Sequence, residues 1–438
     1  MPDEEVATVD TLARQRGRHT LFVVIVGMSL AFVVFGFLVD PPGEVLRGIG
    51  DIVFARDLMI TDFVGVGGLG GAFVHAGVVT LVACAVYRIT GAPVDGAAVA
   101  CLLLVLGTAL YGKTLLNIWP IVAGVALYAW VRGDRLADHV STAFFATALS
   151  PIFSVLAFGT SLPTWAGLAL AVGTSVLIGF VVPPVARRLF DAHAGFTLYN
   201  MGFVAGVVGA VVVSVYRAFG LAPQPEMVWT SGHDTPLLIL LGLVLLGLLA
   251  AAFARDRAPW RHYGVLLRRD GRAPSDFLDS DGAAAVLLNM AVIGALATGY
   301  VLVIGAHLNG PVVAGILSVI GFGACGKHAL NIVPIVAGVA LAGLLKPFEL
   351  TDPGLIWAAL YGTCLAPIAG RFGPHWGVVA GFFHASTAQV TGAVVAGLNL
   401  YGNGFAAGFV AAVVAPVAAF LSHPRRDAAT EEEPVPAA

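Results

Sequence analysis

Charged side chains are scarce in this sequence. Asp, Glu, Lys and Arg make up 11% of the 438 residues, whereas 58% are hydrophobic and the mean hydropathy is +0.90. Soluble domains carry about 25% charged residues, so this composition excludes a soluble globular protein and indicates an integral membrane protein. The formal net charge of −3 provides no basic surface for a nucleic acid, and we expect no nucleic-acid partner.

Cysteines and catalytic motifs are also few. The four cysteines form no CxxC pair and have no Cys/His spacing suited to zinc; they are Cys84, Cys101, Cys325 and Cys364. The motifs HExxH and GxSxG, a Walker lysine and an Asp-rich lipid-diphosphate motif are all absent. Gly65, Gly67 and Gly70 satisfy GxGxxG, but no βαβ pattern surrounds them, and we interpret them as a helix-packing surface. From these absences we expect no enzymatic activity, no metal and no cofactor.

The sequence contains an internal duplication. Residues 112–127 (GKTLLNIWPIVAGVAL) and 326–341 (GKHALNIVPIVAGVAL) share 13 of 16 positions at an offset of 214. Residues 195–212 and 397–414 share 11 of 18 positions at an offset of 202. The repeat therefore extends over most of the chain.

Hydropathy divides each copy into about seven apolar segments. Five in each half are long enough, or nearly so, to span a hydrocarbon core, which requires about 20 helical residues. The third and fourth segments, residues 97–131 in the first half, are too short for two full crossings and predict a broken or re-entrant helix pair. We expect an all-α membrane protein with 10 to 14 membrane segments. Its predicted parts are a cytoplasmic tail (1–19), repeat 1 (20–219), repeat 2 (220–422) and a disordered cytoplasmic tail (423–438).

Arginine placement predicts the orientation. Counting segments from an Arg-containing N-terminus puts residues 132–140, 184–196 and 255–282 and the C-terminus in the cytoplasm, and each of these regions contains arginine. The predicted outer loops 160–162, 305–309 and 396–402 contain no Lys or Arg. An odd number of segments per copy makes the two repeats inverted in the membrane, because the second copy then enters from the opposite side.

Two lysines stand out. Arg outnumbers Lys by 20 to 3, yet Lys113 and Lys327 occupy equivalent positions in the two motifs. A charge at a helix centre costs about 2.5 to 3.5 kcal/mol on insertion scales, so a charge retained in both copies suggests a partner or a task. The alternative is a lysine that reaches the nearer interface or forms a fixed ion pair. We favour a role in a permeation path.

The rest of the motif predicts a helix break. Asn117 and Asn331 each precede a proline, Pro120 or Pro334, by three residues, and each motif begins with a glycine, Gly112 or Gly326. Proline suits the first helical position, so the pattern predicts a break followed by a new helix whose positive end would attract an anion. The alternative for the Asn-Pro element is a capped kink that only shapes packing.

Carboxylates and histidines supply further candidates. Asp62 and Asp276 lie at the entry to the second segment of each half, and we interpret them as helix N-caps; pairing with the lysines or binding a coupling ion is the alternative. His75 and His384 lie inside apolar segments, where a hydrogen-bonded packing role and a proton relay remain open. We interpret Tyr199 and Tyr401, which open the last segment of each half, as interface anchors.

The doubled Gly-Lys-x-x-Leu-Asn-Ile-x-Pro motif resembles that of a bacterial multipass membrane family known only as a domain of unknown function. The resemblance implies a bacterial inner-membrane location and no mechanism. The leading hypothesis is a transporter or channel for a small anionic or polar solute, with Lys113, Lys327, Asn117 and Asn331 binding the solute between the repeats. Exchange coupled to H⁺ or Na⁺ and an intramembrane enzyme acting on a lipid are the alternatives. A homo-oligomer is compatible with the sequence.

Overall fold

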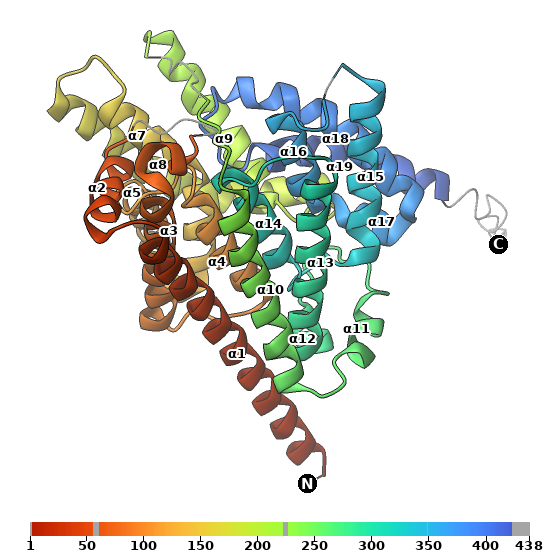
Figure 1. Cartoon of the computed structure of the whole chain (residues 1–438). Helices are drawn as coiled ribbons and strands as arrows, with labels where there is room; N and C mark the ends of the chain where they lie inside the picture. The colour runs from red at the N-terminus through yellow and green to blue at the C-terminus, as the bar shows by residue number, and fades with distance from the viewer. Residues whose placement is uncertain (1, 56–60, 222–226, 348, 423–438) are drawn as a thin grey trace, which may run out of the picture.

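The computed structural model describes residues 2–55, 61–221, 227–347 and 349–422, and the regular structure of these residues is helical (Figure 1). The tail predicted to be disordered, residues 423–438, lies outside the described residues. The helices of the first half are α1 (Pro2–Val39), α2 (Pro42–Val53), α3 (Phe63–Thr90), α4 (Gly96–Thr108), α5 (Trp119–Arg132), η1 (Leu136–His139), α6 (Val140–Ala146), η2 (Thr147–Leu149), α7 (Pro151–Phe158), α8 (Thr164–His193) and α9 (Asn200–Ala218).

The second half contains a similar series of helices, which differ in length and in where they are broken. Its helices are α10 (Asp234–Arg255), α11 (Trp260–Leu266), α12 (Phe277–Asp281), α13 (Ala283–Val303), α14 (Gly310–Phe322), α15 (Ala329–Leu345), α16 (Pro353–Gly362), η3 (Thr363–Leu365), α17 (Ala366–Phe372), α18 (Pro374–Val394) and α19 (Gly402–Ser422). Every predicted apolar segment corresponds to a helix or to a run of short helices.

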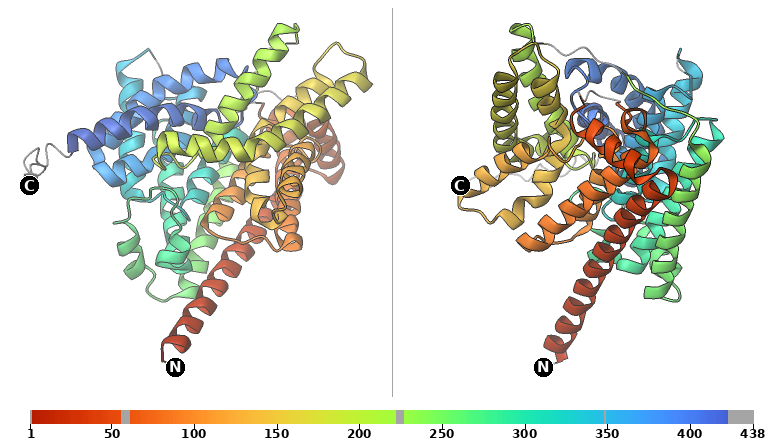
Figure 2. Two further views of the ribbon diagram at one scale, coloured as in Figure 1. Left: turned by 180° about the vertical axis from the view of Figure 1, so that it is seen from behind. Right: turned by 60° about the vertical axis from the view of Figure 1, so that its left-hand side comes forward.

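Several helices are suited to crossing a membrane. Within the described residues, 8 helices are long and apolar enough to span it, and a ninth span results if the pair Leu136–Leu149 and Pro151–Phe158, bent by 46°, is counted as one. The chain is therefore a helical, multipass membrane protein. Helix α1 begins at Pro2, and its N-terminal part extends away from the other helices (Figure 2), so residues 2–19 continue the first helix.

Two short helices, α4 and α14, lie at the centre of the molecule (Figure 1). Each has 13 residues, all or nearly all buried. At 1.5 Å per residue each is about 20 Å long, shorter than a hydrocarbon core of about 30 Å. A Cβ added to Gly107 would lie 2.8 Å from the Cα of Ala314, and one added to Gly321 would lie 3.2 Å from the Cα of Ala100. Since the C-terminal end of each helix meets the N-terminal part of the other, α4 and α14 cross antiparallel.

Glycine produces the same break in both halves. Gly68, inside α3, has φ 75° and ψ 168°, and Gly282, between α12 and α13, has φ 84° and ψ 161°. Residues with a Cβ rarely adopt a positive φ of this kind, so glycine at both positions permits the break. The GxGxxG run that includes this break is a packing surface, as expected: a Cβ added to Gly67 would lie 2.4 Å from the carbonyl oxygen of Gly48 on α2.

The last helices of the two halves meet at a second glycine pair. A Cβ added to Gly202 of α9 would lie 2.8 Å from the Cα of Gly404 of α19, and the reverse distance is the same. Further along, Gly206 faces the ring of Phe405, and Gly408 faces the ring of Phe203. These contacts bring the Leu-Tyr pairs that precede α9 and α19 close to the central helices.

Candidate functional site

The repeated motif forms the loop after each central helix. Helix α4 ends at Thr108 and α5 begins at Trp119, while α14 ends at Phe322 and α15 begins at Ala329. Both helix breaks therefore lie where the sequence predicted them. A Cβ added to Gly112 would lie 2.3 Å from Cδ2 of Leu400, and Gly326 has φ +154° and lies against Leu198. Neither position has room for a side chain.

The two asparagines close these loops. The Asn117 amide oxygen accepts from the N–H of Thr114 (2.8 Å), and its Nδ2 donates to the carbonyl of Gly112 (2.9 Å). Asn331 repeats both contacts, with the N–H of His328 and the carbonyl of Gly326, at 2.8 Å each. Their side chains thus bind the main chain of their own loops, which is the capped-break role left open by the sequence.

The prolines differ between the two copies. Pro120 is the second residue of α5, close to the position expected for it. Pro334 lies inside α15, so the prediction that it begins the second helix is wrong. Helix α15 instead begins at Ala329, where the side chain of Asn331 accepts from the N–H of His328 (2.8 Å) and the N–H of Asn331 donates to the carbonyl of His328 (3.1 Å).

Each buried lysine reaches across to the other half of the chain. Nζ of Lys113 donates to the hydroxyl of Tyr401 (2.5 Å) and to the carbonyl of Phe144 (3.2 Å). Nζ of Lys327 donates to the hydroxyl of Tyr199 (2.8 Å). Both lysine side chains are 0% exposed, and each ammonium group also lies over the ring of its tyrosine, 4.9 and 4.6 Å from the centroid. Within the described residues neither lysine forms an ion pair.

Tyr199 and Tyr401 are therefore not interface anchors. Each is 5% exposed, because the loops before α9 and α19 enter the core where α4 and α14 cross. Two further buried tyrosines meet nearby: Tyr111, in the same loop as Lys113, and Tyr361 of α16, whose hydroxyls are 3.0 Å apart. The Tyr199 hydroxyl also bonds that of Ser318 on α14. The lysines thus lie in a cluster of neutral hydroxyl groups and aromatic rings.

Comparison with known proteins identifies the family. The family model for a protein of unknown function (DUF1576) matches residues 41–218 and 256–420, which is more than half of the chain. The chain belongs to the DUF1576 family. No curated protein and no solved structure matches it. The two matched regions contain both lysine loops and both partner tyrosines of this DUF1576 protein.

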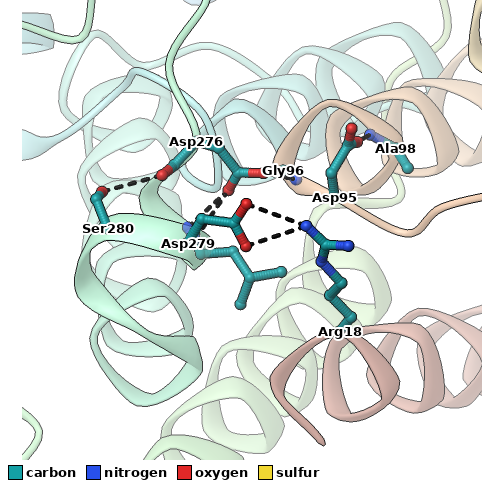
Figure 3. Close-up of polar contacts among 8 residues, drawn as sticks. Arg18, Asp95, Gly96, Ala98, Asp276, Asp279 and Ser280 are labelled. Carbon is teal, nitrogen blue, oxygen red and sulfur yellow. Dashed lines mark hydrogen bonds and ion pairs between the residues drawn. The ribbon is translucent and has the colours of Figure 1, made fainter. Parts of the chain in front are cut away.

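Both aspartates are helix N-caps, as the sequence predicted. Asp62 accepts from the N–H of Val64 (3.0 Å) at the start of α3, and Asp276 accepts from that of Leu278 (2.8 Å) at the start of α12. Neither pairs with a lysine. Asp276 also accepts from the N–H of Gly96 (3.0 Å), the first residue of α4 (Figure 3). Burial raises the pKa of Asp276, and the bond from Gly96 opposes that shift.

The aspartates thereby join the two halves of the DUF1576 fold. Asp276 belongs to the second half and caps α4 of the first half, together with Asp95 of α4 itself, which accepts from Ala98 (Figure 3). In the matching arrangement, Asp62 of the first half lies against Gly310, the first residue of α14, and a Cβ added there would be 2.5 Å from its Oδ1. The coupled-exchange alternative required Lys–Asp pairs. Each carboxylate lies beside a lysine loop, since the N–H of Phe277 donates to the carbonyl of Ala324 and that of Phe63 to the carbonyl of Leu110, but the contacts of both carboxylates within the described residues are with helix N-termini and Thr230, not with a lysine.

The histidines hold neighbouring segments in place. Nδ1 of His75 lies 3.1 Å from the carbonyl of Ala109, directly after α4. At the equivalent position Asn289 donates to the carbonyls of Gly323 (2.8 Å) and Lys327 (2.7 Å). Nε2 of His384 lies 3.1 Å from the amide oxygen of Asn403. These contacts match the packing role that the sequence left open. Within the described residues no group of three or more His, Cys, Asp or Glu side chains is arranged to hold a metal.

Sequence reasoning assigned the wrong role to the two partner tyrosines and missed Tyr111 and Tyr361. One pattern favoured Tyr199 and Tyr401: both Leu-Tyr pairs recur at an offset of 202, as the lysines recur at 214. Tyr111 and Tyr361 have no such pattern: Cys325 corresponds to Tyr111 at the offset of 214, and Phe145 corresponds to Tyr361 at an offset of 216 that aligns residues 143–152 with 359–368. Only the packing of the two halves brings Tyr199 and Tyr401 to the lysines.

Proposed function

We propose that the protein is a membrane transporter or channel for a small anionic or polar solute, with its site between the two halves. The observation that carries the proposal is the pair of fully buried lysines, each bound to a tyrosine of the other half and without a carboxylate partner among the described residues. Burying an ammonium group is costly unless an opposite charge compensates it. A tyrosine hydroxyl accepts a hydrogen bond but supplies no net charge. An anion that enters the site would supply that charge.

The roles follow from the contacts. Lys113 and Lys327 attract the anion, and Tyr401 and Tyr199 hold the ammonium groups in place when it leaves. Because each lysine and its tyrosine come from different halves, a movement of one half against the other changes both pairs together. Such a movement is how transporters built from repeats expose a central site to each side in turn.

We further propose that the two halves are inverted repeats in an inner membrane, with both termini in the cytoplasm. The antiparallel crossing of α4 and α14 supports this arrangement, since two halves related by an axis in the membrane plane meet in that way. The positions of the arginines support the orientation. In this proposal α4 and α14 are the half-length members of the broken helix pairs.

Anion flux into proteoliposomes tests the function. Purified protein is reconstituted, and uptake of chloride, nitrate, phosphate and acetate is measured for the wild type and for Lys113→Met and Lys327→Met. Lys346→Met is the matched control, because Lys346 is the third lysine and lies outside both motifs, where it bonds Ser386 and the carbonyl of Phe382. We expect the control to retain flux and both motif variants to lose at least tenfold.

Unchanged flux in both motif variants would contradict the lysine role. A lack of flux in the wild type for every solute, with hydrolysis of a reconstituted lipid instead, would favour the intramembrane enzyme. A flux that requires a proton or sodium gradient would restore coupled exchange, with groups other than Asp62 and Asp276 carrying the ion.

A further inference from the structure

Helices α2 and α11 occupy equivalent positions in the two halves. At the offset of 214, Leu46 corresponds to Trp260 and Arg47 to Arg261. Each helix precedes an aspartate cap and presents large apolar side chains outward: Leu46 is 66% exposed, Trp260 55% and Val265 50%. Leu266 anchors the inner face of α11 in the core. Both helices therefore lie on the surface with apolar groups facing away from the protein.

Their charges differ. Residues 41–58, around α2, contain two arginines and three acidic residues, whereas residues 255–272, around α11, contain six arginines and two aspartates. Two of these arginines have partners within the protein, since Arg269 pairs with Asp281 and Arg272 donates to the carbonyl of Ala194. The other four are exposed, and their side chains make no hydrogen bond or ion pair within the described residues; they are Arg255, Arg257, Arg261 and Arg268.

The arginines lie at the end of a membrane span. Helix α10, one of the candidate spans, ends at Arg255, and α11 begins five residues later. Trp260 contacts Phe253 in the last turn of α10, with ring centroids 6.0 Å apart. Tryptophan at the end of a span is typical of the headgroup level, and an apolar face beside arginines is typical of a helix that lies in the interface. The four exposed arginines are thus at the level of lipid phosphates.

We propose that α11 and its four exposed arginines bind the phosphate headgroups of anionic phospholipids in the adjacent leaflet. The arginines supply the charge and the paired N–H donors that suit a phosphate. Trp260 and Val265 enter the acyl region beside it, which favours a lipid over a soluble phosphate ester. Helix α2 occupies the same position in its half, but the sequence around it is net acidic. It therefore has no preference for anionic phospholipids. This inference does not depend on transport, because it concerns the surface and not the lysine loops.

Lipid binding tests the proposal on the full chain. Purified protein is placed in nanodiscs with equal amounts of phosphatidylglycerol and phosphatidylcholine, and the lipids retained on release are counted by native mass spectrometry. The test variant changes Arg255, Arg257, Arg261 and Arg268 to Gln. We expect the wild type to enrich phosphatidylglycerol, Arg261→Gln to lower the affinity roughly fivefold, and the fourfold variant to remove the enrichment. Arg47→Gln, the equivalent change on α2, should leave the enrichment intact.

Two further variants separate binding from folding and lipid from phosphate. The fourfold Arg→Lys variant keeps the charge and should retain most of the enrichment. If this variant loses the enrichment and also elutes as an aggregate, it has misfolded. The single variant Arg261→Gln, which changes one exposed side chain, then provides the test. Glycerol phosphate added in excess should not displace the lipid. Full enrichment in the fourfold Gln variant, or full displacement by glycerol phosphate, would overturn the proposal, as would binding of an acidic soluble protein without any lipid preference.

Discussion

The ammonium group of Lys113 lies 2.5 Å from the hydroxyl of Tyr401, a residue 288 positions further along the chain. In the equivalent pair, the lysine, Lys327, belongs to the second half and the tyrosine, Tyr199, to the first, and Nζ lies 2.8 Å from the hydroxyl. Two such pairs, one from each copy, tie the loops of the central helices to the starts of α9 and α19. The proposed anion site depends on this exchange of partners.

Removing either tyrosine hydroxyl should weaken transport without unfolding the protein. Tyr199→Phe and Tyr401→Phe keep the ring and its packing but remove the hydroxyl that accepts a hydrogen bond from the lysine ammonium group. A hydrogen bond to a charged group contributes about 1.5 to 3 kcal/mol. We expect flux to fall about tenfold. Tyr87→Phe is the control, because Tyr87 is also buried but its hydroxyl bonds Ser141 and not a lysine. Equal flux losses in all three variants would show a general packing effect.

The asparagines should matter for stability more than for solute affinity. Asn331→Ala leaves the N–H of His328 and the carbonyl of Gly326 without the bonds that Asn331 makes, at a cost of about 1 to 3 kcal/mol per group. Asn117→Ala does the same to the N–H of Thr114, whereas the carbonyl of Gly112 keeps a longer bond from Ser150 (3.4 Å). We expect a lower midpoint of thermal unfolding in detergent, measured by size-exclusion chromatography with fluorescence detection. An unchanged midpoint with a raised KM would instead assign these side chains to the solute.

The crossing of α4 and α14 should not tolerate a side chain at its glycines. Gly107→Ala places a Cβ 2.8 Å from the Cα of Ala314, so the two helices must separate, at a cost of about 1 to 3 kcal/mol. Gly173→Ala on α8 is the matched control, because nothing lies within 4 Å of its added Cβ. Alanine there should leave the unfolding midpoint unchanged or raise it, since glycine inside a helix is unfavourable. A midpoint that falls equally in both variants would contradict this account.

The Asp276 cap should stabilise the protein through the hydrogen bonds that its side-chain oxygens accept, and its contribution to stability should fall as pH rises. Asp276→Ala should cost about 1 kcal/mol, whereas Asp276→Asn keeps an acceptor for Leu278. Burial raises the pKa of this carboxyl in the folded state, so its contribution to stability is full below the ordinary aspartate pKa and declines as pH rises through the raised value. Relative to Asp276→Asn, the wild type should therefore be most stable at low pH. A wild-type midpoint that rises relative to that of Asp276→Asn as the pH is raised would contradict this sign.

Much of the fold could be predicted from hydropathy and the duplication, because these depend on the order of apolar residues along the chain. The break after α4, the caps at Asp62 and Asp276, and the packing role of Gly67 all followed from local rules. The early start of α15 did not, because the helix begins at Ala329, with the Asn331 side chain bonded to the N–H of His328, and accommodates Pro334 in its interior.

The partners of the lysines could not be predicted from local patterns. The lysines recur at an offset of 214 and the tyrosines at 202, so nothing in either motif relates one to the other. Their contact results from the packing of α9 and α19 on the central helices, where Gly202 meets Gly404. Contacts between distant parts of a chain leave no mark in a single sequence.

Chemical rescue of the lysine positions tests the central claim most directly. The four buried native cysteines are replaced by alanine, Lys113→Cys and Lys327→Cys are introduced singly, and anion flux is measured before and after treatment with aminoethyl or sulfonatoethyl methanethiosulfonate. If an aqueous anion path reaches these positions, both reagents react, the aminoethyl adduct restores the ammonium charge and flux recovers, and the anionic sulfonatoethyl adduct gives no recovery. Failure of both positions to react, or equal flux after either reagent, would contradict the account.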